Sequence, residues 1–171
     1  FNHESQLRQK HYVTRKITSN AARITQEIEE TGKVTPLELG NLNARRDWSD
    51  AQDFIEAMYK MMWLDDPKDY VLSSGETHTI REFVEEAFNF AGFAVEECKW
   101  VGEGTDEIYV HGDHILVEIN PKFYRPAEVD LLIGDSTLAK KELGWSPKSS
   151  FLNLVEKMVR NDLFKSGVDR Q

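Results

Sequence analysis

Residues 121–151, PKFYRPAEVDLLIGDSTLAKKELGWSPKSSF, hold an unusual density of signals that begin and end secondary structure. A short helix is predicted to follow Asp135-Ser136 and to end at Gly144, because glycine is common just beyond the last turn of a helix. A proline and two serines come next, and a longer helix is predicted to begin at Ser150. The stretch therefore predicts one short and one longer helix behind an extended segment.

The rest of the chain continues this alternation of short strands and helices. Four apolar faces have helical spacing: Val13, Ile17, Ala21, Ile24 and Ile28 before Gly32; Ala51, Phe54, Ile55, Met58, Tyr59 and Met62; Ile80, Phe83, Val84, Ala87, Phe88 and Ala91 before Gly92; and Phe151, Leu154, Val155, Met158 and Val159. Strands are predicted at residues 36–39, 70–72, 95–101 and 115–119, with an exposed loop over residues 102–112. This alternation indicates an α/β fold.

Two of the predicted helices open on a capping box. Ser49 precedes Gln52 by three residues, and Thr79 precedes Glu82 by the same spacing. In this motif the hydroxyl accepts a hydrogen bond from a backbone N–H of the first turn, and the later side chain reaches back to the cap. Both helices are therefore expected to begin just after the hydroxyl residue.

Size and charge limit the possible classes of function. The chain has 171 residues and a mass of 19.8 kDa, which suits one domain with a substantial core. A formal net charge of −9 and a pI near 5.1 argue against a nucleic-acid or anionic-membrane partner, because such partners need a basic face. An acidic chain binds a small anion only where a few basic residues meet.

Cysteine content and the chain start bear on location. Cys98 is the one cysteine, so no internal disulfide can form, and a reducing, cytoplasmic setting is expected. No apolar run has the length of a membrane span. The segment from Phe1 has neither the charge nor the apolar run of a signal peptide. It also lacks an initiator methionine, so we expect this chain to be part of a longer one.

Three basic clusters are candidates for binding an anion. They are Arg15-Lys16, Arg45-Arg46, and Arg125 with its neighbour Glu128. The planar guanidinium group of arginine donates two hydrogen bonds to phosphate oxygens, so clusters that meet in space would suit a diphosphate. Glu128 would then suit the hydroxyl pair of a ribose. A surface ion pair between Arg125 and Glu128 is equally compatible with the spacing.

Two other candidate sites are rejected. His111 and His114 lie three apart in a glycine-containing loop, without a third ligand nearby, and are interpreted as exposed polar residues rather than a zinc site. Cys98 has Glu96 and Glu97 as neighbours, and these carboxylates would raise a thiol pKa, which disfavours a nucleophile. The chain also contains no G-x-G-x-x-G, Walker, G-x-S-x-G or H-E-x-x-H motif, and hence no complete catalytic apparatus.

Several segments, taken in order, resemble one enzyme family. They are Asn2-His3-Glu4-Ser5, Val13-Thr14-Arg15-Lys16-Ile17, Leu39-Gly40-Asn41-Leu42, Arg46-Asp47-Trp48, Ser74-Gly75-Glu76-Thr77-His78, Arg125-Pro126-Ala127-Glu128-Val129-Asp130, Gly134-Asp135 and Leu143-Gly144-Trp145-Ser146-Pro147. In this combination the chain, from Phe1 to Leu163, resembles the C-terminal half of the GDP-mannose 4,6-dehydratases, a family of extended short-chain dehydrogenases/reductases. The first two segments are more specific to that family than the elements near residues 125 and 143, which many nucleotide-sugar enzymes share.

The resemblance implies a two-domain enzyme of which this chain is the C-terminal portion. Residues 1–47 would start the small mixed α/β substrate domain and hold GDP-sugar-binding segments. Residues 48–68 would form a helix of the Rossmann domain, and residues 69–171 the C-terminal substrate-binding domain. The N-terminal NADP-binding Rossmann domain would be absent from this chain. Phe54, Met58 and Met62 would then be exposed without the sheet they cover.

The resemblance also implies a reaction. The family converts GDP-mannose to GDP-4-keto-6-deoxy-mannose, in nucleotide-sugar metabolism that includes GDP-fucose biosynthesis. Bound NADP takes a hydride from C4 of the sugar, water is lost across C5–C6, and the hydride returns to C6. A Tyr/Lys pair, a Thr and a Glu would act upstream of Phe1, so this chain alone is expected to be inactive. A complete enzyme would be a homo-oligomer of two or four chains.

Individual residues take roles from the same resemblance. The GDP-mannose contacts would be Asn2, Val13, Lys16, Arg46, Arg125 and Glu128, and the NADP contacts would be His3 and Arg8. In that arrangement Arg46 and Arg125 neutralise the diphosphate and Glu128 binds the ribose diol. Val13 and Lys16 lie beside the guanine. No metal ion is implied.

One departure from the family and two other functions stay open. Gln6 and Gln9 stand where the family has proline and glycine, which puts the cofactor role of Arg8 in question. A stand-alone module that binds a GDP-sugar without turnover would have measurable affinity by itself. A reductase or epimerase acting on another nucleotide sugar is disfavoured by the segments at residues 2–5 and 13–17.

Overall fold

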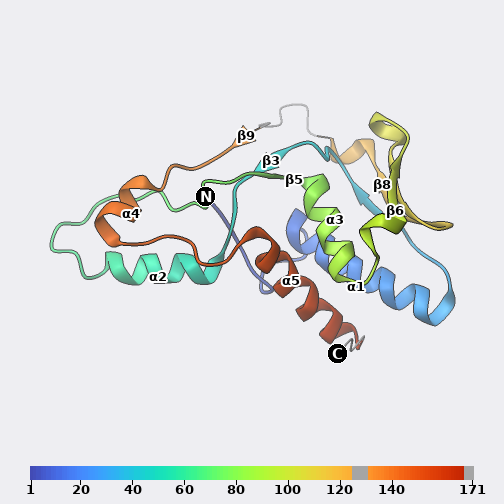
Figure 1. The fold of residues 1–171 in the computed structure, drawn as a ribbon, viewed down its shortest axis with the longest axis horizontal. Helices are drawn as coiled ribbons and strands as arrows, with labels where there is room; N and C mark the ends of the chain where they lie inside the picture. The colour runs from blue at the N-terminus through green and yellow to red at the C-terminus, as the bar shows by residue number, and fades with distance from the viewer. Residues whose placement is uncertain (125–130, 168–171) are drawn as a thin grey trace.

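The computed structural model describes residues 1–124 and 131–167 of the chain, and within them strands and helices alternate along the sequence (Figure 1). The helices are α1 (Val13–Thr31), α2 (Ala51–Met61), α3 (Ile80–Phe90), α4 (Thr137–Leu143) and α5 (Phe151–Ser166), with short 3-10 turns η1 (Val95–Glu97), η2 (Gly104–Asp106) and η3 (Pro121–Phe123). The strands are β1 (Asn2–Glu4), β2 (Leu37–Leu39), β3 (Arg45–Arg46), β4 (Trp48–Asp50), β5 (His78–Thr79), β6 (Cys98–Val101), β7 (Ile108–His111), β8 (His114–Ile119) and β9 (Leu131–Leu132). The predicted α/β class is confirmed.

The strands form three small sheets. The largest has the order β2-β8-β7-β6, in which β2 runs parallel to β8 and the other pairs are antiparallel. A second sheet has the order β5-β3-β9, and a third pairs β1 with β4 in parallel. The last two sheets join distant parts of the chain, so residues 2–4, 45–50, 78–79 and 131–132 lie close together.

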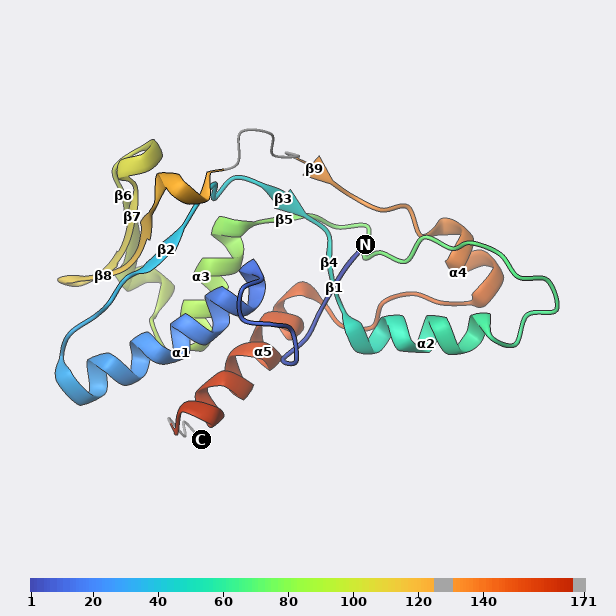
Figure 2. The ribbon, with the colours of Figure 1, turned by 180° about the vertical axis from the view of Figure 1, so that it is seen from behind.

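The main hydrophobic core lies between α1, α3 and α5 and the sheet that contains β8 (Figures 1 and 2). Phe83, Phe88 and Leu116 are fully buried in it, and the ring of Phe88 meets those of Phe93 and Tyr109 edge to face. Each fully buried side chain of this size contributes roughly 1.5–3 kcal/mol relative to an exposed one. The predicted core faces of α1, α3 and α5 are therefore confirmed, although four of their residues are only partly buried: Val13, Ile28, Ile80 and Phe151.

Local signals explain how these helices begin and end. Thr79 accepts a hydrogen bond from the backbone N–H of Glu82, whose side chain accepts one from the backbone of Thr79, so the predicted capping box is present. Gly32 ends α1 in the left-handed conformation at φ 66°, where a Cβ would be strained, and Gly144 ends α4 in the same way. The Ser150 side chain caps α5, as predicted.

The other predicted capping box is wrong. Asp50, rather than Ser49, caps α2 and accepts a hydrogen bond from the backbone N–H of Gln52 at 2.9 Å. Ser49 lies in β4 opposite His3, and its hydroxyl is buried without a hydrogen-bond partner among the described residues. The parallel pairing with β1 keeps residues 48–50 extended, so the helix begins one residue later than predicted.

Three predictions about strands and the loop between them are also wrong. Residues 70–72 form no strand, and residues 95–97 form the turn η1 before β6 begins at Cys98. The region 102–112 is not simply a loop, because it contains η2 and β7. β7 pairs with both β6 and β8, and such long-range pairing is what makes Ile108–His111 a strand.

α2 and α4 lie away from the main core and share a smaller one (Figure 1). This second cluster contains Phe54, Ala57, Leu72, Ala139 and Trp145. Of the residues predicted to be exposed on α2, Met58 and Met62 are 45% and 78% exposed, whereas Phe54 is only 3% exposed because its ring packs against Trp145. None of the helices in the described residues has both the length and the apolar character needed to cross a membrane.

Candidate functional site

A pocket of about 510 Å³ opens beside the N-terminal end of α1. Residues from β1, the following loop, α1, the end of β2, β3 and η3 line it: Asn2, Glu4, Arg8, His11, Tyr12, Val13, Thr14, Lys16, Leu39, Gly40, Asn41, Ala44, Arg46, Ile80, Lys122 and Phe123. Its volume lies within the range of small-molecule sites. Among the residues predicted to bind a ligand, Asn2, Arg8, Val13, Lys16 and Arg46 meet here.

β1 presents alternate residues to the pocket. Asn2 and Glu4 line it, as expected for positions two apart on a strand. His3 does not line the pocket, and its ring stacks on Phe54 with centroids 4.8 Å apart. The structure therefore separates His3 from the other predicted contacts.

The first turn of α1 also faces the pocket. Val13 and Thr14 line it, and the residue before the helix, Tyr12, makes no side-chain cap hydrogen bond. Backbone N–H groups at such a helix start point outward without intrahelical partners, which favours a nearby anion. The first turn also carries no acidic residue that would repel one.

Lys16 also lines the pocket, and its ammonium group is held in two ways. Its Nζ donates a hydrogen bond to the backbone oxygen of Glu38 at 2.7 Å and lies 3.9 Å from the centroid of the Phe123 ring. The pKa of Lys16 is lowered because its ammonium group is partly buried, and the negative charge of nearby Glu38 offsets only part of this effect. Lys16 thus ties α1 to β2 and η3 at the pocket wall.

Gly40 and Phe123 form a part of the wall that sequence reasoning does not reveal. A Cβ on Gly40 would lie 2.4 Å from the backbone oxygen of Phe123, so only glycine allows the two segments to approach so closely. Asn120 fixes η3, because its backbone N–H donates to the Leu39 oxygen and its side chain accepts from Lys122. The Gly40-Asn41 pair after a predicted strand is the available signal for this wall.

Arg46 reaches the pocket from β3, a short strand that is followed directly by Asp47 and β4. The next residue, Asp47, is fully buried, and its carboxylate accepts hydrogen bonds from the backbone of Ser74 and Gly75 at 2.9 and 3.0 Å and of Gly134 at 3.3 Å. The Ser74 hydroxyl adds another at 2.6 Å. Asp47 therefore holds three distant segments together directly beside Arg46.

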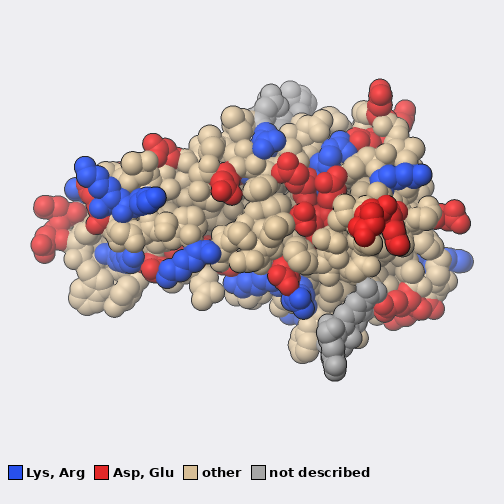
Figure 3. Space-filling model, viewed as in Figure 1, with Lys and Arg blue, Asp and Glu red and all other residues tan. Residues whose placement is uncertain are grey.

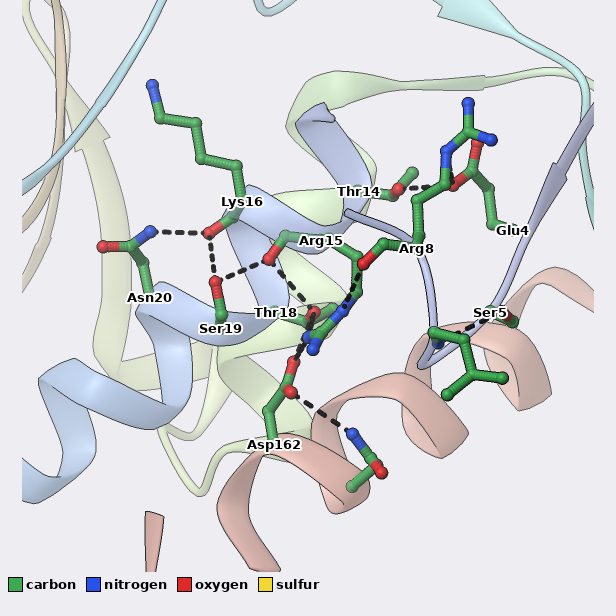
Figure 4. A network of polar contacts seen from close by, with 12 residues as sticks. Glu4, Ser5, Arg8, Thr14, Arg15, Lys16, Thr18, Ser19, Asn20 and Asp162 are labelled. Carbon is green, nitrogen blue, oxygen red and sulfur yellow. Dashed lines mark hydrogen bonds and ion pairs between the residues drawn. The ribbon is translucent and has the colours of Figure 1, made fainter. Parts of the chain in front are cut away.

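Arg8 lies on the loop between β1 and α1, near a buried carboxylate (Figure 4). Its Nε is 3.4 Å from Oε2 of Glu4, and its guanidinium carbon is 3.7 Å from the centroid of the Tyr12 ring. Thr14 donates a hydrogen bond to the same Glu4 oxygen at 2.7 Å. The pKa of Glu4 is raised because its carboxylate is buried. The hydrogen bond from Thr14 and the charges of Arg8 and His3 offset only part of this effect.

Arg15 does not reach the pocket, which corrects its place in the predicted basic cluster. It is buried, and its guanidinium pairs with Asp162 of α5, which also accepts a hydrogen bond from Thr18 (Figure 4). Adjacent positions on a helix point about 100° apart, so Arg15 and Lys16 necessarily serve different surroundings. Arg45 likewise donates to Thr77 rather than lining the pocket.

The remaining predicted contacts, Arg125 and Glu128, lie outside the described residues. The chain on either side of them is described, and η3 with Lys122 and Phe123 belongs to the pocket wall.

The two rejected sites have ordinary partners. His111 Nε2 lies 3.1 Å from a carboxylate oxygen of Glu97, which suits a surface pair. The pKa of Cys98 is raised, as predicted, but burial is the largest cause and the carboxylates of Glu97 and Glu96 are smaller ones. A thiol with a raised pKa is a poor nucleophile.

The cationic lining of the pocket contrasts with the negative net charge of the chain. Acidic side chains gather over α3 on the face drawn in Figure 3, in keeping with the net charge of −9. The pocket instead collects Arg8, Lys16, Arg46 and Lys122 around one carboxylate, Glu4. An acidic chain that concentrates cations in one hollow favours an anionic ligand there.

Comparisons with known sequences agree on one family. The model of a protein family described as GDP-mannose 4,6 dehydratase matches residues 1–158. A GDP-mannose 4,6 dehydratase from Drosophila melanogaster is 47% identical over 165 residues, which cover 95% of this chain and 40% of the relative. The human protein of the same description is 41% identical, with 95% and 42% covered. The chain thus spans less than half the length of these relatives.

Solved structures share the fold at lower identity. RMD from Pseudomonas aeruginosa, complexed with NADPH, has a TM-score of 0.73 and 20% identity, with 96% of this chain and 47% of that chain covered. A UDP-glucose 4-epimerase from Thermotoga maritima, with UDP-glucose, has a TM-score of 0.69 and 18% identity, with 98% and 45% covered. The fold of this chain is therefore that of a portion of each of these two structures.

Proposed function

The chain belongs to the GDP-mannose 4,6-dehydratase family, and we propose that it is the portion of such an enzyme that holds GDP-mannose. The observation that carries this proposal is the convergence of Asn2, Val13, Lys16 and Arg46 in one pocket. They come from three separate elements, and the sequence resemblance implies a substrate contact for each of them. A single ligand in this pocket would contact residues of β1, α1 and β3 together.

The chemistry of the pocket supports a sugar diphosphate as the ligand. Arg46 and the open N-terminal end of α1 offer positive charge and N–H donors, which suit phosphate oxygens. Asn2 offers both a donor and an acceptor for a sugar hydroxyl. In the proposal Val13 and Lys16 lie beside the guanine, while Arg125 and Glu128 add a second cation for the diphosphate and an acceptor for the ribose.

The proposed reaction of the complete enzyme converts GDP-mannose to GDP-4-keto-6-deoxy-mannose. NADP would accept the hydride and later return it to the sugar. The preceding portion of the enzyme would hold most of that cofactor and the catalytic residues. This chain would contribute Arg8, whose cationic side chain suits a phosphate, and His3, which is exposed and stacked on Phe54. Two or four copies in the cytoplasm are expected to form the active assembly.

The proposed domain division assigns residues 48–68 to the Rossmann domain, and residues 1–47 and 69–171 to the substrate domain. The exposed side chains of Ile55, Met58, Tyr59, Met62 and Trp63 on and just after α2 support it. A contiguous apolar surface of this kind is unusual unless another part of the protein covers it. The preceding portion of the enzyme is the covering element that we propose.

Binding measurements test the substrate role. In the complete enzyme, Arg46→Met should weaken GDP-mannose binding by about ten- to a hundredfold, because one charge-assisted hydrogen bond is lost. Arg160→Met is the matched control, since Arg160 lies on α5, is exposed and pairs with Glu156. Arg125→Ala should also weaken binding with little effect on folding. Unchanged affinity in Arg46→Met, measured by calorimetry, would contradict the proposal.

A stand-alone binding module is the second candidate function. It predicts that the 171-residue chain binds GDP-mannose by itself, whereas the dehydratase proposal predicts weak or no affinity because one wall of the cleft would be missing. The natural gene product distinguishes the two directly. Residues before Phe1 that include a glycine-rich loop and a Tyr-x-x-x-Lys motif favour the dehydratase, and their absence favours the module.

A further inference from the structure

Glu4 is a buried carboxylate on the pocket wall to which no binding role has been given above. It is 4% exposed and lies on the same side of β1 as Asn2. Burial of a carboxylate costs free energy unless its partners compensate for the lost water. The partners of Glu4 therefore indicate what it does.

One oxygen of Glu4 meets two groups from different segments. Oε2 accepts the hydrogen bond from Thr14 at 2.7 Å and lies 3.4 Å from Nε of Arg8 (Figure 4). Thr14 belongs to the first turn of α1 and is itself buried. Glu4 thus connects the strand that carries Asn2, the helix that carries Val13, and the loop that carries Arg8.

Arg8 is held at its side chain and at its backbone by different residues. The guanidinium group lies over the Tyr12 ring and beside Glu4, while the carbonyl oxygen accepts a hydrogen bond from Nε of Arg15 at 3.2 Å. Arg15 in turn is fixed by Asp162 of α5. The Arg8 Nε makes an ion pair but no hydrogen bond among the described residues, so the geometry restrains the group without using up its donors.

We propose that Glu4 is a positioning residue that keeps the Arg8 guanidinium group at the pocket, ready for a phosphate of the ligand. Only the identity of the ligand rests on the function proposed above. The phosphate belongs either to the sugar nucleotide or to the cofactor, and both present the same chemistry to Arg8. Without the Glu4 carboxylate, the backbone of Arg8 stays bound to Arg15, but its guanidinium group is no longer held toward the pocket.

Nuclear magnetic resonance of the 171-residue chain tests the positioning directly. In the native chain the Arg8 Nε–H signal is expected to be shifted by the Tyr12 ring and protected from exchange with water. Glu4→Gln, which keeps size but removes charge, should move that signal toward the value of a free arginine. Glu156→Gln is the matched control, because Glu156 also pairs with an arginine four residues away, but that arginine is 67% exposed.

A double-mutant cycle tests whether Glu4 acts through Arg8. The cycle uses the complete enzyme, and GDP and NADP are titrated separately, so that the two sources of phosphate are distinguished. Glu4→Gln should weaken binding of one of them about tenfold in the native background and hardly at all in an Arg8→Met background, because coupled residues are not additive. Glu4→Asp, which keeps the charge but shortens its reach, should restore part of the loss.

The outcomes separate this proposal from the proposed function. An unchanged Arg8 signal in Glu4→Gln, or an equal loss of affinity in both backgrounds, overturns the positioning role of Glu4 and leaves the proposed function standing. If the Arg8 signal shifts in Glu4→Gln but the complete enzyme binds neither GDP nor NADP, the positioning role stands and the proposed ligand is wrong. If Glu4→Gln unfolds the chain, the milder Glu4→Asp carries the same test.

Discussion

The region around α1, α3 and α5 and the region around α2 and α4 are built from similar apolar helix faces, but only the first is fully covered. In the first region Phe88 is completely buried, together with most of the predicted face of each helix. In the second, Met62 and Trp63 are 78% and 74% exposed, and only one side of α2 packs against α4 and Trp145. The same kind of pattern therefore leads to two different degrees of burial.

The difference shows which region is structurally self-sufficient. The three helices of the first region close on each other and on the large sheet, and the candidate pocket lies at their edge. The second region has a small cluster and an uncovered face, which is the basis of the proposal that another part of the enzyme covers it. Asp47 lies where the two regions join. It directly follows β3, and its hydrogen bonds reach residues 74–75, which come after α2, and Gly134, which comes before α4.

The largest effect is expected in the covered core. Phe88→Ala should lower the free energy of unfolding by about 3–5 kcal/mol, since it removes a ring that packs against Phe93 and Tyr109 and leaves a cavity. Chemical denaturation measures the loss, and Phe164→Ala on the exposed side of α5 is the control. A loss below about 1 kcal/mol, the range of small core changes, would mean that this region is less tightly packed than its burial indicates.

Removal of the junction should come next. Asp47→Ala should cost about 2–3 kcal/mol, because it removes a fully buried carboxylate that accepts hydrogen bonds from the amides of Ser74, Gly75 and Gly134. Hydrogen exchange should show faster opening at residues 72–75 than in α3. Asp113→Ala, at an exposed turn, serves as the control. Equal acceleration in both regions would show that Asp47 supports the whole molecule and not only the junction.

A smaller effect is expected at the cap of α3. Thr79→Ala removes the hydroxyl that accepts from the Glu82 amide and should cost about 1 kcal/mol. Thr79→Ser keeps the hydroxyl and should be close to native. Because α3 belongs to the covered region, the loss should appear in global unfolding measured by denaturant. A loss confined to local exchange at residues 79–82 would instead mean that the helix start frays independently.

The smallest effect is expected on the uncovered face. Met62→Gln should change the free energy of unfolding of this chain by less than about 0.5 kcal/mol, because the side chain is already in water. It should reduce self-association, measured by light scattering, since the exposed apolar surface shrinks. A large destabilisation would show that Met62 is buried in solution, by a second copy or otherwise, and would break the contrast between the two regions.

Local patterns predict the helices and several of their ends well. The capping box of Thr79 and the glycine at position 32 depend on residues a few positions apart, so their effect can be predicted from a short window. β7 escapes prediction for the opposite reason. Ile108–His111 becomes a strand because β6 and β8 flank it, and that pairing involves residues outside its own segment.

The candidate site shows the same division. Arg46 and Lys16 are candidates because of the chemistry of their guanidinium and ammonium groups, and the structure brings both to one pocket. Arg15 groups with Lys16 in the sequence because they are neighbours, yet it pairs with Asp162 on a helix that lies far along the chain. Glu4 has no such signal, because a lone carboxylate indicates nothing until its neighbours are known.

By itself the sequence determined the periodicity of the helices, most of their caps, the acidic balance of the chain and the resemblance that predicted the family. These depend on the order of neighbouring residues, on composition and on chemical types at given positions. Only the tertiary structure decided which cations meet, which apolar face stays uncovered, and that Glu4, Thr14 and Arg8 share one contact. The physical reason is that burial and charge pairing are set by segments distant in sequence, and these approach each other only when the chain folds.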